Sequence, residues 1–165
     1  MNKSNGQAED KKILNIIVDT SGSMVESGKR LIARGVVRQV EQYIRLGYSS
    51  MTLQLFSVGN KITPIEWNTN DEYPEVLFSC SGSLDLDPLI DFIKSQEAMY
   101  LIVSDCSWSG RSVKKFLRGI DELPDDTVRI IKVGAEQSSS IKNIKVFESE
   151  DTLLALEGWI GALSL

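Results

Sequence analysis

The sequence predicts an α/β fold, in which an open, doubly wound and mostly parallel sheet carries helices on both faces and one antiparallel edge strand. Three observations predict this class. Short apolar runs alternate with longer stretches whose apolar residues recur every three or four positions. One pair of apolar runs is separated only by a Gly-Asn turn, as in a hairpin. The 165 residues correspond to about one domain, and they contain no internal repeat.

Six runs are expected to be strands: residues 13–18, 51–58, 61–67, 100–104, 128–133 and 144–147. The first of them is short and rich in isoleucine, which is typical of a strand buried on both faces. Pro64 lies in the third run and lacks a backbone donor, so that run is expected at an edge of the sheet.

Four helices are expected, over residues 29–46, from Asp87 onward, after the Ser-Gly pair at 109–110, and over 151–163. The first has an apolar face formed by Ile32, Val36, Val37, Val40, Tyr43 and Ile44. Gly47 is expected to end it, and Asp87 with Pro88 to begin the second as N-cap and first-turn residue. The order describes a Rossmann-like domain over residues 12–165, preceded by a disordered tail over residues 1–11.

The composition excludes several kinds of chemistry. The chain has no histidine, which excludes histidine-dependent triads and histidine-ligated zinc, and its two cysteines cannot complete a structural zinc site. Its net charge of −5 argues against binding to nucleic acid. No apolar run approaches the roughly 20 residues of a membrane helix, and no secretion signal is visible. We therefore expect a cytoplasmic protein with free thiols and no contact with membranes.

Polar side chains follow two of the expected strands. Asp19 closes the first strand and Asp105 closes the run 100–104. Ser21 and Ser23 follow Asp19 at every second position, so their hydroxyls can point the same way as its carboxylate. Ser83 lies in a third polar loop. Ligands bind outside the carboxyl ends of strands in such sheets, and oxygen-only sites suit hard cations such as Mg²⁺. The sequence therefore predicts a site for Mg²⁺ or Mn²⁺.

The run Asp-Thr-Ser-Gly-Ser-Met at residues 19–24 resembles the DxSxS metal-ion-dependent adhesion site of von Willebrand factor type A (vWA) domains, also called integrin I-like domains. The resemblance extends over almost the whole ordered chain, because the order of elements matches too. It implies that Asp19, Ser21 and Ser23 form the first part of a metal site and that Asp105 matches the later Asp of the family.

The sequence departs from the family pattern in two places. The family usually has a Thr in a Gly-rich loop, where this chain reads Ser-Gly-Ser-Leu-Asp over residues 81–85. Spacing from Gly82 places Ser83 at the Thr position, whereas an alignment on Asp85 would place Leu84 there and remove the ligand. The family's later Asp is often followed by Gly, where this chain has Cys106.

Several of these residues have a simpler interpretation. Asp19, Ser21 or Ser23 could only cap the following helix, and Asp85 and Asp87 are expected to begin a helix rather than bind metal. Trp108 fits either an interface anchor or the core. Cys80 and Cys106 flank two of the metal loops and could form a redox lock, although two reduced thiols are the ordinary expectation. The arginines of the first helix are expected to form a solvated face or, alternatively, to bind an acidic partner: Arg30, Arg34, Arg38 and Arg45.

The predicted function is a Mg²⁺-dependent protein-interaction module, in which an Asp or Glu of a partner protein completes the coordination of the metal. The resemblance also implies a place in an intracellular multiprotein system, such as one built around an AAA+ ATPase or a stress or defence response. Two alternatives stay open, a Mg²⁺-dependent phosphotransferase or hydrolase and a structural subunit with a vestigial site. Catalysis is not expected, since the chain has neither histidine nor a phosphate-binding Gly-Lys-Ser/Thr loop.

Overall fold

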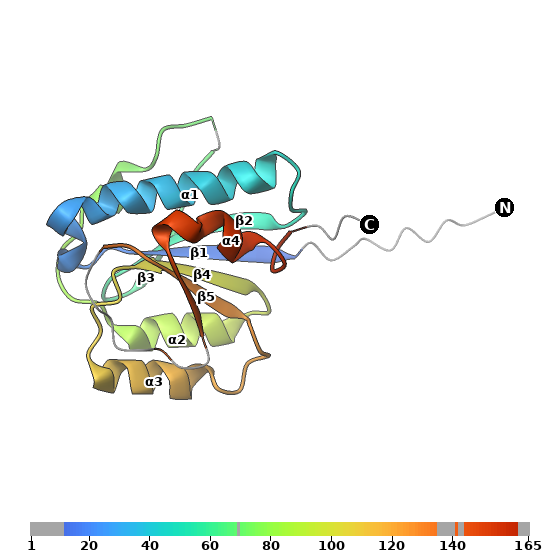
Figure 1. The fold of residues 1–165 in the computed structure, drawn as a ribbon. Coiled ribbons are helices and arrows are strands. Elements are labelled where there is room, and N and C mark those ends of the chain that lie inside the picture. Colours follow the sequence, from blue (N-terminus) through green and yellow to red (C-terminus); the bar gives the residue numbers. More distant parts are fainter. Residues whose placement is uncertain (1–11, 69, 135–140, 142–143, 162–165) are drawn as a thin grey trace.

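A single sheet lies at the centre of the molecule and helices cover both of its faces (Figure 1). The computed structural model describes residues 12–68, 70–134, 141 and 144–161. The sheet order is β3-β2-β1-β4-β5-β6, and every neighbouring pair is parallel except β2 and β3. The strands are β1 (Ile13–Asp19), β2 (Thr52–Val58), β3 (Ile62–Ile65), β4 (Met99–Ser104), β5 (Val128–Lys132) and β6 (Lys145–Glu148). The predicted fold class is confirmed, with β3 as the antiparallel edge strand.

The two faces of the sheet bury two separate apolar clusters. Helices α1 (Lys29–Arg45) and α4 (Thr152–Leu156) cover one face, and α2 (Leu86–Ser95) and α3 (Gly110–Ile120) cover the other (Figure 1). Alternation along β1 supplies both clusters, since Ile16 and Val18 belong to the first and Ile17 to the second. The central strands β1, β4 and β5 are buried along almost their whole length, whereas the edge strands β3 and β6 are partly exposed.

Helix α1 follows its predicted pattern closely. Gly47 has φ +89°, and the amide of Tyr48 donates to the carbonyl of Tyr43 at 3.1 Å, as expected for a glycine-dependent helix end. The buried side of the helix differs from the prediction in its first turn, where Ile32 is exposed and Lys29 is buried instead.

Two predicted helix boundaries are wrong. Asp85, not Asp87, is the N-cap of α2, since its carboxylate accepts a hydrogen bond from the Asp87 amide at 3.0 Å. The last helix is predicted over 151–163 but α4 ends at Leu156, where Glu157 becomes extended and Gly158 has φ +68°. The predicted tail over residues 1–11 and the last residues of the predicted helix lie outside the described part of the chain.

Candidate metal centre

The two aspartates of the predicted site follow neighbouring strands. In the parallel pair of β1 and β4, Val18 is opposite Val103, so both strands deliver their next residues to the same edge of the sheet. Asp19 is the last residue of β1 and Asp105 directly follows β4, and each is only 1% exposed. Two buried carboxylates at one edge favour a nearby cation, because desolvated negative charge requires compensation.

Asp19 is held by two hydrogen bonds. One carboxylate oxygen accepts the Ser21 amide at 2.8 Å, and the other accepts the Ser104 hydroxyl at 2.6 Å. Burial raises the pKa of Asp19, although the hydrogen bonds from Ser104 and Ser21 oppose this, and the negative charge of Asp105 raises it further. The orientation of this carboxylate is therefore fixed, while its ionised form is not fully stabilised by the groups around it.

Asp105 is held by a buried lysine. Its Oδ2 lies 3.0 Å from the Nζ of Lys29, and its Oδ1 accepts the Ser107 amide at 3.1 Å. Burial alone would raise the pKa of Asp105, but the hydrogen bonds from Lys29, from the Ser23 hydroxyl and from Ser107 lower it. Asp105 is thus the more strongly stabilised anion of the two aspartates.

The hydroxyls of Ser21 and Ser23 lie side by side, with 3.4 Å between their oxygens. They lie at the start of η1, a 3-10 segment over Gly22–Gly28, in which Ser21 occupies the N-cap position without a side-chain capping bond. Helix α1 has Gly28 as its N-cap. The capping interpretation of Ser21 therefore lacks the hydrogen bond that it requires.

Ser83 belongs to a loop that is attached to the first motif. The Gly22 amide donates to the Gly82 carbonyl at 2.8 Å, and the Ser81 amide donates to the Thr20 carbonyl at 3.0 Å. A Cβ at Gly22 would lie 3.3 Å from the Gly82 oxygen, so this approach suits glycine. The backbone contacts thus hold the 81–83 loop beside the DxSxS segment.

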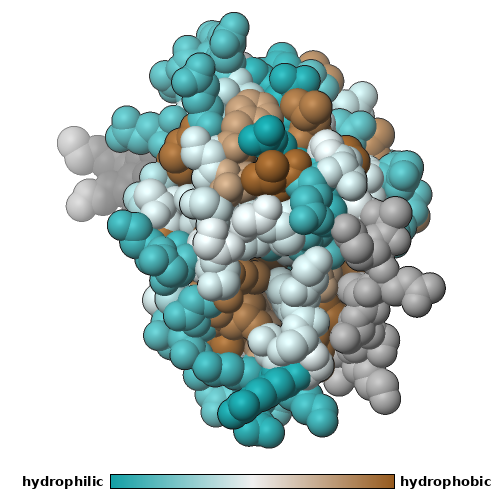
Figure 2. Space-filling model, turned by 90° about the vertical axis from the view of Figure 1, so that its left-hand side faces the viewer, coloured by the Kyte–Doolittle hydropathy of each residue, from teal (hydrophilic) through white to brown (hydrophobic). Residues whose placement is uncertain are grey.

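All five predicted site residues line one pocket of about 370 Å³: Asp19, Ser21, Ser23, Ser83 and Asp105. Leu84, the alternative to Ser83, lines it too, but it has no donor atom and packs against the α2 and α3 cluster. Figure 2 shows this end of the molecule, where pale residues of intermediate hydropathy lie between brown apolar ones. The role of the five predicted site residues as metal ligands stays a prediction.

The donor set fits a small divalent cation. Neighbouring ligands of an octahedral Mg²⁺, each about 2.1 Å from the ion, are about 3.0 Å apart, which is close to the 3.4 Å between the two serine hydroxyls. Among the described residues, no group of three or more His, Cys, Asp or Glu side chains could hold a metal. A metal here would therefore depend on hydroxyl ligands as well as on the two carboxylates.

Sequence reasoning missed Lys29 and Ser104. Ser104 orients Asp19 and also accepts the Cys106 amide at 3.0 Å, and a single serine at a strand end gives no signal of this role. Lys29 did leave a signal, because it continues the buried stripe of Ala33, Val36 and Val40 by one turn. A lysine on an apolar stripe is expected to have a buried partner.

The remaining candidates have structural roles. Asp85 caps α2, as noted, and Asp87 pairs with Lys115 at 2.6 Å. Trp108 is 8% exposed and packs edge-to-face on Phe116 in the core, and it also lines the candidate pocket.

The two cysteines are free, and they pack against the clusters on opposite faces of the sheet, Cys80 on the α1 face and Cys106 on the α2 face. No disulfide lock joins the metal loops in this structure. Cys106 has φ +55°, the left-handed conformation that glycine adopts most easily. The departure from the family's glycine therefore falls at a position where backbone geometry favours glycine.

The arginines of α1 do not all lie on a solvated face. Arg30 donates to the Phe78 carbonyl at 2.9 Å, and Arg38 donates to the Asp71 carbonyl at 2.7 Å while lying 4.7 Å from the ring centre of Trp67. Arg45 pairs with Glu41 at 2.6 Å. Arg30 and Arg38 thus attach Trp67, Asp71 and Phe78 to the helix.

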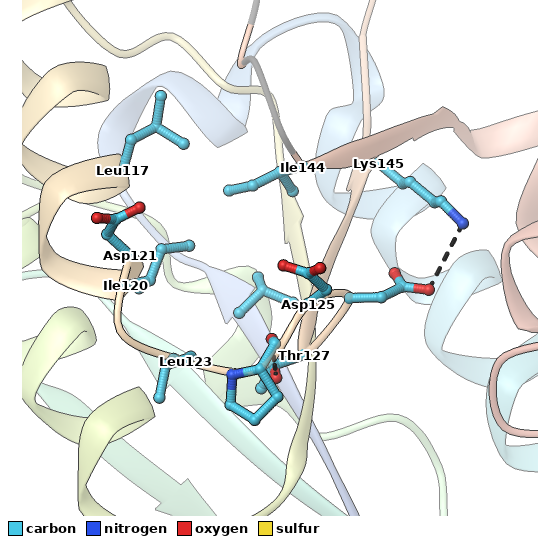
Figure 3. A pocket seen from close by; sticks show the side chains of 11 residues that line it. Leu117, Ile120, Asp121, Leu123, Asp125, Thr127, Ile144 and Lys145 are labelled. Atoms are coloured by element: carbon cyan, nitrogen blue, oxygen red, sulfur yellow. Dashed lines mark hydrogen bonds and ion pairs between the residues drawn. The ribbon is translucent and has the colours of Figure 1, made fainter.

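A larger cavity, of about 540 Å³, lies near the C-terminal end of α3 and the beginnings of β5 and β6 (Figure 3). Figure 3 shows apolar side chains such as Leu117 and Ile120 around the carboxylates of Asp121 and Asp125. Because it lies at the amino ends of parallel strands, it is away from the edge where such sheets bind ligands. We therefore place the candidate site in the smaller pocket.

No family model matches the sequence, and a search of curated proteins found no match. Solved structures with similar folds were found. An aerotolerance-related membrane protein from Bacteroides fragilis, mutated at several positions to serine, has a TM-score of 0.59 at 11% identity over 90% of this chain and 98% of that one. The manganese-loaded TRAP protein of Plasmodium vivax has a TM-score of 0.55 at 13% identity, over 92% of this chain and 74% of that one.

A third structure is proximal thread matrix protein 1 from the mussel byssus with a zinc-occupied MIDAS motif, a metal-ion-dependent adhesion site. Its TM-score is 0.56 at 10% identity, and the match covers 88% of this chain but only 45% of that one. These proteins share the architecture that the resemblance predicts. The chain has the vWA fold. Within the described residues of this vWA-like chain, no helix has both the length and the apolar character needed to cross a membrane.

Proposed function

We propose that this vWA-like chain is a metal-dependent protein-binding module. Asp19, Ser21, Ser23, Ser83 and Asp105 would hold the metal, which we take to be Mg²⁺ or Mn²⁺. When bound, the divalent cation supplies a positive charge to which an Asp or Glu side chain of a partner protein can bind. We further propose that the module works within an intracellular multiprotein assembly.

The observation that supports this proposal is the convergence of all five residues on one pocket at the carboxyl edge of the sheet. The hydroxyls of Ser21 and Ser23 are not used as caps, and the carboxylates of Asp19 and Asp105 are oriented by neighbouring donors. Two proteins of the same fold carry manganese or zinc, the latter at an adhesion-site motif. This agreement favours a divalent cation in this chain too.

We also propose that the module binds rather than catalyses. A hydrolase or phosphotransferase needs an activated nucleophile or base, and the chain has no histidine. Burial raises the pKa of Cys80, and it raises the pKa of Cys106 to about 12. Both thiols are therefore protonated at neutral pH and are poor nucleophiles.

Thermal unfolding with and without metal tests the metal site. If Mg²⁺ binds the folded state with a Kd of about 1 mM, then 10 mM Mg²⁺ adds roughly 1.4 kcal/mol of stability. For a domain of this size, we expect the Tm to rise by about 3–5 °C. The variants Ser21→Ala and Asp19→Asn should remove this rise.

Ser112→Ala is the matched control, because Ser112 lines the same pocket without being a predicted ligand. It should keep the rise in Tm. A parent protein whose Tm is the same in Mg²⁺, Mn²⁺ and EDTA would contradict the proposal and favour a vestigial site. Partner capture from the native source in Mg²⁺ and in EDTA then tests the second step, since binding through a carboxylate should be lost in EDTA and in Ser21→Ala.

A further inference from the structure

Lys29 is a buried cation inside the candidate metal centre. Its side chain is 1% exposed, and its Nζ lies 3.0 Å from Asp105 Oδ2 and 3.3 Å from the Ser23 carbonyl oxygen. Both contacts are with residues predicted to hold the metal. A lysine is seldom fully buried unless it is paired, so this ammonium is part of the site and not a surface group nearby.

The backbone places Lys29 there. Gly28 has φ +70° and Ser27 has φ +52°, and this left-handed pair ends η1 and begins α1 with Lys29 as its first residue. Lys29 is also on the side of α1 that faces the sheet, one turn before Ala33. The geometry therefore directs the side chain from the helix start towards the end of β4.

The ammonium changes the charge of the centre. Asp19 and Asp105, when ionised, contribute two negative charges and Lys29 contributes one positive charge, which gives these three side chains a net charge of −1. A divalent cation would bring the same group to +1, whereas two carboxylates alone would reach zero. A centre with a net positive charge attracts an anion more strongly than a centre whose charges sum to zero.

We propose that Lys29 is a built-in counter-ion of this centre, which holds Asp105 while the centre is metal-free and leaves the metal-loaded centre positively charged, so that it selects an anionic ligand. The inference rests on the proposed metal site. Lys29 is a positioning residue here and acts through Asp105 and through the charge of the pocket. One consequence is weak affinity for metal, since like charges at such distances repel even in a polar environment.

Metal affinity in lysine variants tests the inference. We expect Lys29→Gln to bind Mn²⁺ at least roughly tenfold more tightly than the parent protein, by calorimetric titration or by the electron paramagnetic resonance of free Mn²⁺, because one repelling charge is removed. The glutamine amide can still donate a hydrogen bond to Asp105, which protects the fold. Lys29→Arg keeps the charge, and its Kd should stay within about threefold of the parent value.

Lys115→Gln is the control for net charge. Lys115 is also paired with an aspartate, Asp87, but the two side chains are 56% and 58% exposed, and neither lines the pocket. This variant changes the total charge by the same amount and should leave the Kd unchanged. If Lys115→Gln tightens binding as much as Lys29→Gln, the effect is general electrostatics and the inference is wrong.

The selection of an anion has its own measurement. Acetate serves as the carboxylate probe and acetamide as the neutral one, and both are titrated into Mn²⁺-loaded protein while water-proton relaxation reports displacement of bound water. We expect acetate to displace bound water at a lower concentration from the parent than from Lys29→Gln. Acetamide should require the same concentration in both proteins. Equal acetate responses would overturn the selection of an anion.

The outcomes separate this inference from the proposed function. If the parent and Lys29→Gln bind Mn²⁺ equally well, the metal site stands and the counter-ion role is wrong. If only Lys29→Gln binds, the ammonium takes the place of a metal in the natural chain, so the proposed function is wrong while the counter-ion role holds. If neither binds, both are wrong.

Discussion

At the scale of a residue, Asp19 shows that a side chain suited to binding a ligand can lower the stability of the fold. The side chain is almost fully buried and accepts hydrogen bonds from Ser21 and Ser104, yet its pKa is raised, because burial outweighs these bonds. In the absence of metal, the ionised form of Asp19 therefore opposes folding at neutral pH. Such a cost is expected where a group is kept for binding and not for packing.

Asp19→Asn should therefore stabilise the metal-free protein at pH 7.5. The amide can keep both contacts, accepting from the Ser21 amide and donating to the Ser104 hydroxyl. A carboxyl whose pKa is raised in the folded state loses stability as pH rises above its unfolded value of about 3.9. The advantage of the variant should thus be largest near neutral pH and shrink as the pH falls towards 4.

Urea unfolding in EDTA at several pH values measures this difference. Asp91→Asn removes the same charge from an exposed position of α2 and serves as the control. A variant that is less stable than the parent at pH 7.5, or whose advantage is the same at all pH values, would contradict the interpretation of Asp19.

Single residues also show where sequence reasoning reached its limit. The positions of Asp19, Ser21, Ser23 and Asp105 followed from strand ends and a short motif, which are local features. Lys29 was missed because its partner, Asp105, is 76 residues away in the chain. Only the folded structure shows that the charge on the apolar side of α1 is compensated.

At the scale of an element, the contact between α2 and α3 depends on a glycine. A Cβ on Gly119 would lie 2.6 Å from Cγ2 of the buried Ile90, too close for a branched side chain to avoid without moving. A Cβ on Gly35, in α1, would enter open space. Gly119 and Gly35 therefore offer a matched pair, one required by packing and one not.

Gly119→Ala should lower the free energy of unfolding by roughly 1 kcal/mol, since overpacking costs about 1–3 kcal/mol and the gain in helix propensity returns up to about 1 kcal/mol. Gly35→Ala should raise it by about 0.5–1 kcal/mol. Urea unfolding measures both. In an Ile90→Ala background the penalty at Gly119 should disappear, and a penalty that persists there would mean that the contact with Ile90 is not its cause.

The end of α4 illustrates why some elements could not be predicted. Apolar spacing over 151–163 fits a helix, but tertiary contacts replace its continuation after Leu156. Arg129 donates to the Ala155 carbonyl at 2.8 Å and lies 5.0 Å from the ring centre of Trp159, whose indole donates to the Asp126 carbonyl at 2.7 Å. Periodicity detects which side of a segment is apolar, and it does not detect partners of this kind.

At the scale of the whole molecule, the parallel sheet explains why the sequence could predict that the candidate site residues lie close together. A parallel arrangement brings the carboxyl ends of its strands to one edge. Residues that follow these strands therefore meet there even when they are far apart in the sequence. The third loop depended on more than this rule. Its place beside the DxSxS segment is set by the Gly22–Gly82 and Thr20–Ser81 backbone bonds.

Metal binding should accordingly stabilise one end of the molecule more than the other. We expect 10 mM Mg²⁺ to slow amide hydrogen exchange in residues 20–28, 79–85 and 106–109, because the proposed ligands lie in or beside these three loops. Residues 121–128, around the larger cavity at the opposite end, should change little. Exchange followed by mass spectrometry in Mg²⁺ and in EDTA measures this, with Ser21→Ala as the control that should not respond. A ligand held by three loops protects those loops even when global unfolding is rare. Equal slowing along the whole chain would therefore show that Mg²⁺ stabilises the fold without binding at this edge.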